Sequence, residues 1–209
     1  MIQTVRPHLS ALLLSSLCAL ALPAWATDAP AAPAAALPST SLYQLPATLN
    51  NQDGKPFKLR DLRGHPVLVS MFYNSCEFVC PMLIDTMRQT QQALDPATRE
   101  RLSMLLITFD PARDDIKALK TVARQRELDP AHWSVARTDA ASVRKIAATL
   151  DIQYRRLESG EYNHTTVLVL LDGDGRVLGR TLKIGAVDPA FVQLIRDTAA
   201  AATAKSAAR

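Results

Sequence analysis

Two cysteines, Cys76 and Cys80, stand four positions apart between two strong structural patterns. The apolar run Val67–Phe72 precedes them and predicts a buried strand, and Pro81 follows at a place suited to the first turn of a helix. A thiolate is both a nucleophile and a soft metal ligand, and the helix N-terminus is expected to favour the thiolate of Cys80. The three intervening residues allow a redox disulfide or a metal site, so the spacing alone leaves both chemistries open.

A histidine would turn this pair into a metal site. The chain has four histidines, of which His164 is predicted to open a strand that continues through residues 165–170. The other three are expected in the N-terminal segment, in a turn and in a loop: His8, His65 and His132. Two thiolates and one imidazole suit copper or zinc, whereas a structural zinc site would need a fourth ligand, for which we find no candidate. We therefore predict a copper site, for Cu(I) or Cu(II), at Cys76, Cys80 and His164, with a structural role for His164 as the alternative.

The third cysteine, Cys18, lies in a predicted targeting segment. Arg6, an apolar run of 14 residues at 9–22 and the small-residue site Ala-Trp-Ala at 24–26 are typical of a cleaved secretory signal peptide over residues 1–26. The run is shorter than the roughly 20 apolar residues of a membrane-spanning helix, which disfavours an uncleaved anchor. Leu17 is too bulky to precede a lipidated cysteine. We therefore expect a periplasmic protein with two remaining thiols, for which a purely structural disulfide would contribute little because it closes a small loop.

Composition indicates one folded domain. Removal of residues 1–26 leaves 183 residues, enough for one hydrophobic core. The net charge of +4 is dispersed, without a basic tract, so we expect no binding to nucleic acid. Residues 27–40 are rich in Ala and Pro and predict a flexible linker, followed by the domain at 41–200 and a disordered tail at 201–209.

The predicted elements alternate between strands and helices. Buried strands are expected at 67–72 and 102–109, and an amphipathic helix at 114–128. The remaining elements are a hairpin from 42–49 and 56–59, a helix from 81 to about 94, a strand at 132–138, a helix at 140–150, strands at 152–157, 164–171 and 176–183, and a closing helix from 189 to about 200. This order predicts an α/β, thioredoxin-like fold with an N-terminal β-hairpin extension, a middle insertion, and a C-terminal hairpin plus helix. In such a sheet, the loop before the strand at 164–171 lies beside the cysteines.

Three motifs, in this order along the chain, resemble the Sco/SenC family of copper-binding, thioredoxin-fold assembly factors. They are CEFVCP at 76–81, FDPARD at 109–114, and YNHT at 162–165 followed by the DGDG turn at 172–175. The resemblance covers about residues 42–198. Two positions differ from many members of that family: Glu77 stands where proline is common, and Asn163 where aspartate is common.

This resemblance implies a function and a partner. It implies that Cys76, Cys80 and His164 are copper ligands, and that the protein delivers copper to, or reduces the cysteines of, the binuclear copper site of a respiratory cytochrome oxidase subunit. Another periplasmic copper or thiol protein, or a client at the membrane surface, is also consistent with it. Glu77 and Asn163 are expected to change the surroundings of the ligands without removing one.

Other functions remain open from the residues themselves. The Cys76–Cys80 pair at a helix start also suits a thiol–disulfide oxidoreductase that keeps client cysteines reduced. A peroxidase of the peroxiredoxin type is disfavoured, because neither cysteine has a Ser or Thr three residues before it. A purely structural interaction module is the remaining alternative. Asp110, Arg113 and Asp114 are expected to turn the chain at a strand end, with Asp114 as the cap of the next helix. Contact of these residues with the site or with a client is the alternative.

Overall fold

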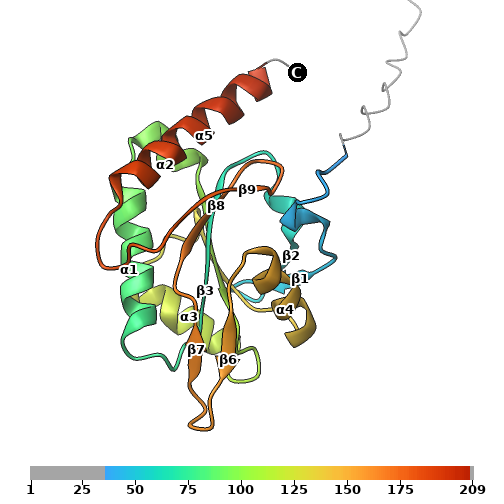
Figure 1. Cartoon of the computed structure of the whole chain (residues 1–209), viewed down its shortest axis with the longest axis vertical. Coiled ribbons are helices and arrows are strands. Elements are labelled where there is room, and N and C mark those ends of the chain that lie inside the picture. Colours follow the sequence, from blue (N-terminus) through green and yellow to red (C-terminus); the bar gives the residue numbers. More distant parts are fainter. Residues whose placement is uncertain (1–35, 208–209) are drawn as a thin grey trace, which may run out of the picture. The chain divides into compact units, whose positions relative to one another are not determined.

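The computed structural model describes residues 36–207, with side chains to residue 204 (Figure 1). The predicted signal peptide and residues 27–35 of the predicted linker lie outside this part. Residues 36–40, which we assigned to the linker, belong to the folded domain, since Leu37 packs against the core and the Gln44 side chain donates to the Pro38 carbonyl at 2.6 Å. No helix in the described part is both long and apolar enough to cross a membrane.

A five-stranded sheet in the order β5-β4-β3-β8-β9 forms the centre of the fold. β3 (Val67–Phe72), β4 (Ser103–Thr108) and β5 (Trp133–Ala136) are parallel, whereas β8 (Leu168–Leu171) and β9 (Val177–Thr181) add antiparallel strands beyond β3. Every residue of β3 and β8 is buried, as expected for strands covered on both faces. In Figure 1 the helix α1 (Val79–Gln92) lies on one side of the sheet. The helix α4 (Ala140–Thr149) and the hairpin of β1 (Thr48–Asn50) and β2 (Pro56–Lys58) lie on the other side.

The helices follow the predicted order with two corrections. Asp115, not Asp114, caps α3, because its side chain accepts from the backbone N–H of Ala118 at 2.8 Å. The closing helix continues to Ala207, so residues 201–207 of the predicted disordered tail are helical. The helices are α1 (Val79–Gln92), α2 (Pro96–Arg101), α3 (Ile116–Gln125), α4 (Ala140–Thr149) and α5 (Pro189–Ala207).

The N-terminal hairpin is confirmed, but its first strand is shorter than predicted. β1 (Thr48–Asn50) pairs antiparallel with β2 (Pro56–Lys58), and a short 3-10 helix, η2 (Leu59–Leu62), leads on to β3. Residues 42–44, which we predicted as strand, form the 3-10 helix η1 (Leu42–Gln44). Ser41 caps this turn by accepting from the Tyr43 N–H at 3.0 Å, and Pro46 has no N–H to donate to a strand ladder.

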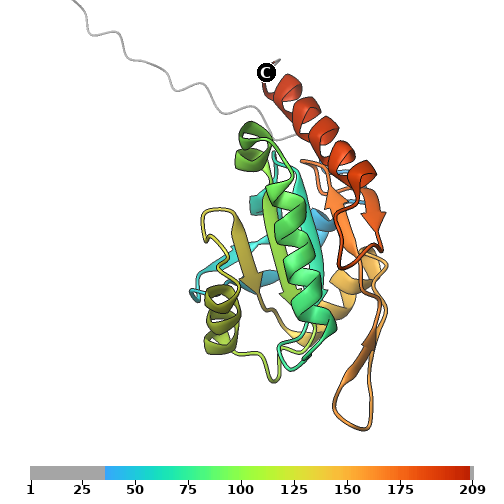
Figure 2. The same ribbon diagram turned by 90° about the vertical axis from the view of Figure 1, so that its left-hand side faces the viewer.

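A second hairpin stands outside the central sheet. β6 (Tyr154–Arg156) and β7 (Tyr162–His164) pair only with each other among the described strands, and Figures 1 and 2 show them projecting from one end of the domain. Gly160, with φ of +87°, lies in the turn of this hairpin. His164 therefore ends β7 instead of opening the strand that becomes β8, and residues 165–167 connect the two. The α/β, thioredoxin-like fold class is confirmed.

Candidate metal centre

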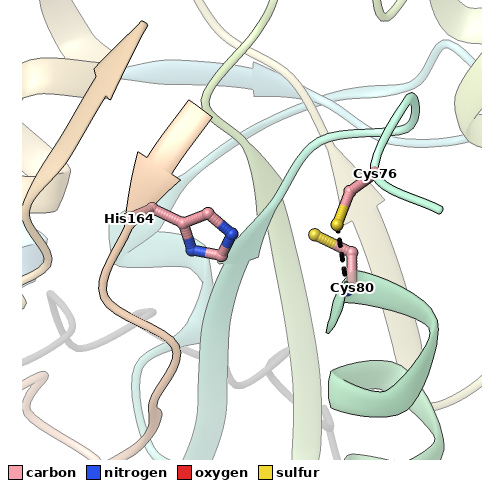
Figure 3. A group of neighbouring side chains, drawn as sticks. All are labelled: Cys76, Cys80 and His164. Carbon is pink, nitrogen blue, oxygen red and sulfur yellow. Dashed lines mark hydrogen bonds between the residues drawn. The ribbon is translucent and has the colours of Figure 1, made fainter. Parts of the chain in front are cut away.

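Three predicted ligands converge at the end of the sheet from which α1 starts. Cys76 lies in the loop between β3 and α1, Cys80 in the first turn of α1, and His164 at the end of β7 (Figure 3). The two sulfur atoms and one imidazole nitrogen all lie within 4.8 Å of one another. Both cysteines are free thiols. The chain thus brings together residues 84 positions apart, from a helix start and a separate hairpin, into one group of soft donors.

Helix α1 begins without a polar side-chain cap. Its N-cap residue, Phe78, makes no capping hydrogen bond, and the first turn holds no acidic residue. The first N–H groups of a helix have no partner within it. One of them, the N–H of Cys80, donates to Cys76 Sγ at 3.2 Å (Figure 3). The Cys76 sulfur therefore takes the position of an N-cap oxygen, where the partial positive charge of the helix end stabilises a thiolate.

The two thiols differ in their acidity. Burial alone would raise the pKa of Cys76, but hydrogen bonds to its sulfur from Cys80 and from the Phe78 backbone outweigh burial and lower that pKa. Cys80 is 2% exposed, and burial raises its pKa. This corrects the sequence-based expectation that the helix start favours the thiolate of Cys80, because the freed N–H points to the other sulfur. Cys76 is the more reactive and more accessible thiol.

His164 is held as a neutral ligand with a defined tautomer. Its Nδ1 lies 3.2 Å from the carbonyl oxygen of Thr165, which can only accept a hydrogen bond. Nδ1 therefore carries the proton and Nε2 keeps its lone pair, the arrangement that most metal-binding histidines adopt. Burial lowers the pKa of His164, although the bond to Thr165 opposes that effect. The imidazole is consequently neutral at physiological pH and ready to bind a metal.

An aromatic cluster surrounds the imidazole. The His164 ring lies 4.9 Å from Phe109 and 5.8 Å from Tyr73, measured between ring centroids. Tyr162 and Tyr154 complete the cluster, at 5.0 and 5.2 Å from Phe109. Edge-on and stacked contacts of this kind fix ring orientation and keep water away from one side of the site. Tyr73, Tyr154 and Tyr162 were not predicted as site residues, since their spacing along the chain gives no sign that they meet.

The segment after β4 connects the thiol loop with the hairpin. The buried Asp114 carboxylate accepts from the Asn74 N–H at 3.1 Å and from the Thr108 hydroxyl, so it supports the loop that carries Cys76. Arg113 pairs with Asp110 and donates to the Gly160 carbonyl in the hairpin turn at 2.8 Å. The predicted role of Asp114 as a helix cap is wrong.

The two other histidines in the described part of the chain lie outside the candidate metal centre. His65 is exposed before β3, and His132 lies 3.6 Å from Glu100, so neither belongs to the cluster of potential ligands in the described part of the chain. Glu77 and Asn163 are both exposed. Asn163 precedes His164 on β7, and successive strand residues face opposite sides, so its side chain points away from the imidazole.

The fold and the site together define a thioredoxin-like protein with two thiols and one histidine as a candidate metal centre. Comparison with known sequences gives the family: the SCO1/SenC family profile matches residues 36–198. The chain therefore belongs to the SCO1/SenC family.

Individual relatives agree with this assignment. A "putative copper-binding protein" of Stutzerimonas stutzeri is 37% identical over 73 residues, which are 35% of this chain and 36% of the relative. The structure of copper-bound ScoI of Bradyrhizobium japonicum has a TM-score of 0.60 at 23% identity, covering 73% of this chain and 96% of that one. BsSco, described as a Sco-family cytochrome c oxidase assembly protein with a disulfide switch, has a TM-score of 0.63 at 25% identity, covering 75% and 91%. The chain spans less than half the length of the curated relatives it matches.

Proposed function

We propose that this protein binds one copper ion through Cys76, Cys80 and His164 and delivers it to the copper site of a respiratory oxidase subunit. The observation that carries this proposal is the approach of all three donor atoms to within 4.8 Å of one another. Around one ion at roughly 2.0–2.3 Å from each donor, three donors stand about 3.5–4 Å apart, so shifts of about 1 Å suffice. Two thiolates with a neutral imidazole are a soft set that suits copper.

The same site suits release of copper as well as binding. Three donors leave a position open for a ligand of the receiving protein. Cys76 is half-buried and Cys80 is buried, so the client would approach from the Cys76 side. Membership of the SCO1/SenC family and the description of BsSco as a cytochrome c oxidase assembly protein support an oxidase subunit as that client.

We infer that the protein acts in the periplasm. The charged start, the apolar run of 14 residues and the small-residue site at 24–26 support export and cleavage after Ala26. Mass spectrometry of the protein from a periplasmic extract should give a mature chain that begins at Thr27. An uncleaved chain in the membrane fraction would refute cleavage after Ala26, and a full-length chain in the cytoplasmic fraction would refute the inference as a whole.

Copper titration tests the metal site. Purified, reduced protein should bind one Cu(I) or one Cu(II) per chain, and Cu(II) should give thiolate-to-copper absorption. His164→Ala should weaken binding, and Cys76→Ser or Cys80→Ser should abolish the absorption that depends on both sulfurs. His65→Ala is the matched control, because His65 is exposed and outside the cluster. Equal copper affinity in the wild type and in His164→Ala would refute the three-donor site.

A second function, reduction of client disulfides, is favoured by the difference between the two thiols. The Cys76 thiolate would attack a client disulfide and form a mixed disulfide, releasing one client thiolate. Cys80 would then attack Cys76 Sγ, which releases the second client thiol and leaves a Cys76–Cys80 disulfide. The client gains two electrons and this pair loses two. Cys80→Ser should trap the mixed disulfide, whereas Cys76→Ser should not, and absence of any trapped species would exclude this function.

A further inference from the structure

The three donors lie on two parts of the chain that are not joined by a common sheet. Cys76 and Cys80 flank the start of α1, which follows the central strand β3, whereas His164 ends the separate β6–β7 hairpin. Strand hydrogen bonds fix β3 within the central sheet, but among the described strands β7 pairs only with β6. The position of His164 over the thiols therefore depends on contacts between the hairpin and the body of the domain.

One such contact is a hydrogen bond between two side chains. The Tyr73 hydroxyl donates to the Glu161 carboxylate at 2.7 Å. Tyr73 follows β3 directly and is 4% exposed, and Glu161 stands next to β7, three residues before His164. This bond links the body of the domain to the hairpin through two residues that lie 88 positions apart in the sequence. A hydrogen bond to a charged group is stronger than one between neutral groups.

Tyr73 also touches both halves of the metal site. Its ring meets the His164 ring edge-on, at 5.8 Å and an interplanar angle of 89°. Its hydroxyl, which donates to Glu161, is also near enough to the Cys76 thiol for the two groups to interact electrostatically. Neither Tyr73 nor Glu161 is needed as a donor to the metal, since the three donors converge without them.

We propose that Tyr73 and Glu161 are positioning residues, whose hydrogen bond holds the β6–β7 hairpin against the thiol loop so that His164 shares one copper ion with Cys76 and Cys80. This inference rests on the proposed copper-binding function. Arg113, which donates to the Gly160 carbonyl in the same turn, is a second contact between the body of the domain and the hairpin. Partners that orient ligands in this way typically change metal affinity by about 10–100-fold when they are removed.

Four variants and a control separate this role from general packing. Tyr73→Phe removes the hydroxyl and keeps the ring, Glu161→Ala removes the acceptor, and Glu161→Gln keeps an acceptor oxygen. The fourth variant combines Tyr73→Phe with Glu161→Ala. Tyr154→Phe is the matched control, because the Tyr154 ring stacks in the same cluster at 5.2 Å from Phe109. Affinity for Cu(II) is measured by competition with a chelator, and the imidazole is followed by electron paramagnetic resonance.

Tyr73→Phe and Glu161→Ala should each weaken Cu(II) binding by about 10–100-fold and shift the spectrum towards that of His164→Ala. Glu161→Gln and Tyr154→Phe should stay close to the wild type. The double variant should lose no more than the larger single loss, because both changes break the same bond. An unchanged copper affinity in Glu161→Ala would overturn the proposal. Losses of affinity that add in the double variant would overturn it too. Either result would mean that Tyr73 acts on the site through Cys76 alone, without Glu161.

A measurement without metal distinguishes failure of this proposal from failure of the copper function. Backbone amides at Leu157 and Thr165, which close the hairpin turn and its base, should exchange hydrogen faster in Glu161→Ala than in Tyr154→Phe. If exchange is faster in Glu161→Ala but the wild type binds no copper, the role of Glu161 in positioning the hairpin stands and the copper site is refuted. Equal exchange in both variants would overturn the positioning role, whatever the wild type binds.

Discussion

Replacing Asp114 by alanine removes the support of the loop that carries Cys76. The Asp114 side chain is 3% exposed and accepts hydrogen bonds from the Asn74 N–H, at 3.1 Å, and from the Thr108 hydroxyl. Alanine leaves both donors without this acceptor. We expect lower stability of the folded domain and, because Asn74 lies two residues before Cys76, weaker copper binding.

The size of the effect follows from the number of bonds lost. Hydrogen bonds to a charged group contribute about 1.5–3 kcal/mol each, so two would give roughly 3–6 kcal/mol. Removal of a buried carboxylate also removes its desolvation cost, so the lower end applies, and we expect a loss of about 3 kcal/mol. For a domain of this size each kcal/mol lowers the melting temperature by about 2–4 °C, which gives a decrease of about 6–12 °C.

Thermal unfolding followed by circular dichroism, with reductant and chelator present, measures this change. Asp115→Ala is the control, because Asp115 is exposed and only caps α3, and it should cost about 1 kcal/mol. A change within about 0.5 kcal/mol in Asp114→Ala, the range of ordinary surface substitutions, would refute the reasoning.

Asp114→Asn separates the charge from the hydrogen bonds. Burial raises the pKa of Asp114 above its ordinary value of 3.8, although the bonds from Thr108 and Asn74 oppose that effect. A carboxyl whose pKa is raised by folding contributes stability below the unfolded pKa, and this contribution is lost as the pH rises through the folded pKa. From about pH 4 upwards, the wild type should therefore lose stability relative to Asp114→Asn. A difference that is constant from pH 4 to 7 would contradict the raised pKa.

Two further predictions concern the thiols and a turn. Iodoacetamide at neutral pH should modify Cys76 at least about tenfold faster than Cys80, because Cys76 is more exposed and has the lower pKa. Peptide mapping measures both rates, and equal rates would contradict the assignment of Cys76 as the more acidic thiol. Gly175→Ala should cost about 2–3 kcal/mol, since its φ is +80° and a Cβ would lie 2.7 Å from the Tyr43 ring. Gly64→Ala is the control, because Gly64 has φ of +100° but a Cβ there would have no neighbour within 4 Å, and it should cost only about 1 kcal/mol. Urea unfolding measures both losses of stability. A larger loss in Gly64→Ala than in Gly175→Ala would refute the steric argument.

The sequence was sufficient for the fold class and for most of the central sheet. A short continuous apolar run such as Val67–Phe72, followed at once by the start of a helix, fits a buried strand, and the DGDG turn at 172–175 marks the hairpin of β8 and β9. It failed at 42–44, where a serine cap and a following proline gave a 3-10 turn in place of a strand. It also failed at the end of α5, where an alanine-rich segment continued the helix for seven residues beyond the expected end.

The candidate site was predicted in part. The predicted place of His164 beside the cysteines in a thioredoxin-like sheet led to its prediction as the third donor, and the structure puts its imidazole within 4.8 Å of both sulfur atoms. Residue type determines which atoms can bind a soft metal, and that information is local. The family resemblance rested on the same local motifs, and the SCO1/SenC match over residues 36–198 confirms it.

Only the tertiary structure decided how these residues are used. It placed the free N–H of the α1 start on Cys76, which made Cys76 the more acidic thiol. It showed that Asp114 accepts a hydrogen bond from the loop that carries Cys76 and does not cap a helix. It also showed a hydrogen bond between Tyr73 and Glu161, which lie 88 positions apart in the sequence. The physical reason is that a hydrogen bond requires a particular donor and acceptor to meet within about 3 Å, and for distant residues the path of the whole chain determines which ones do.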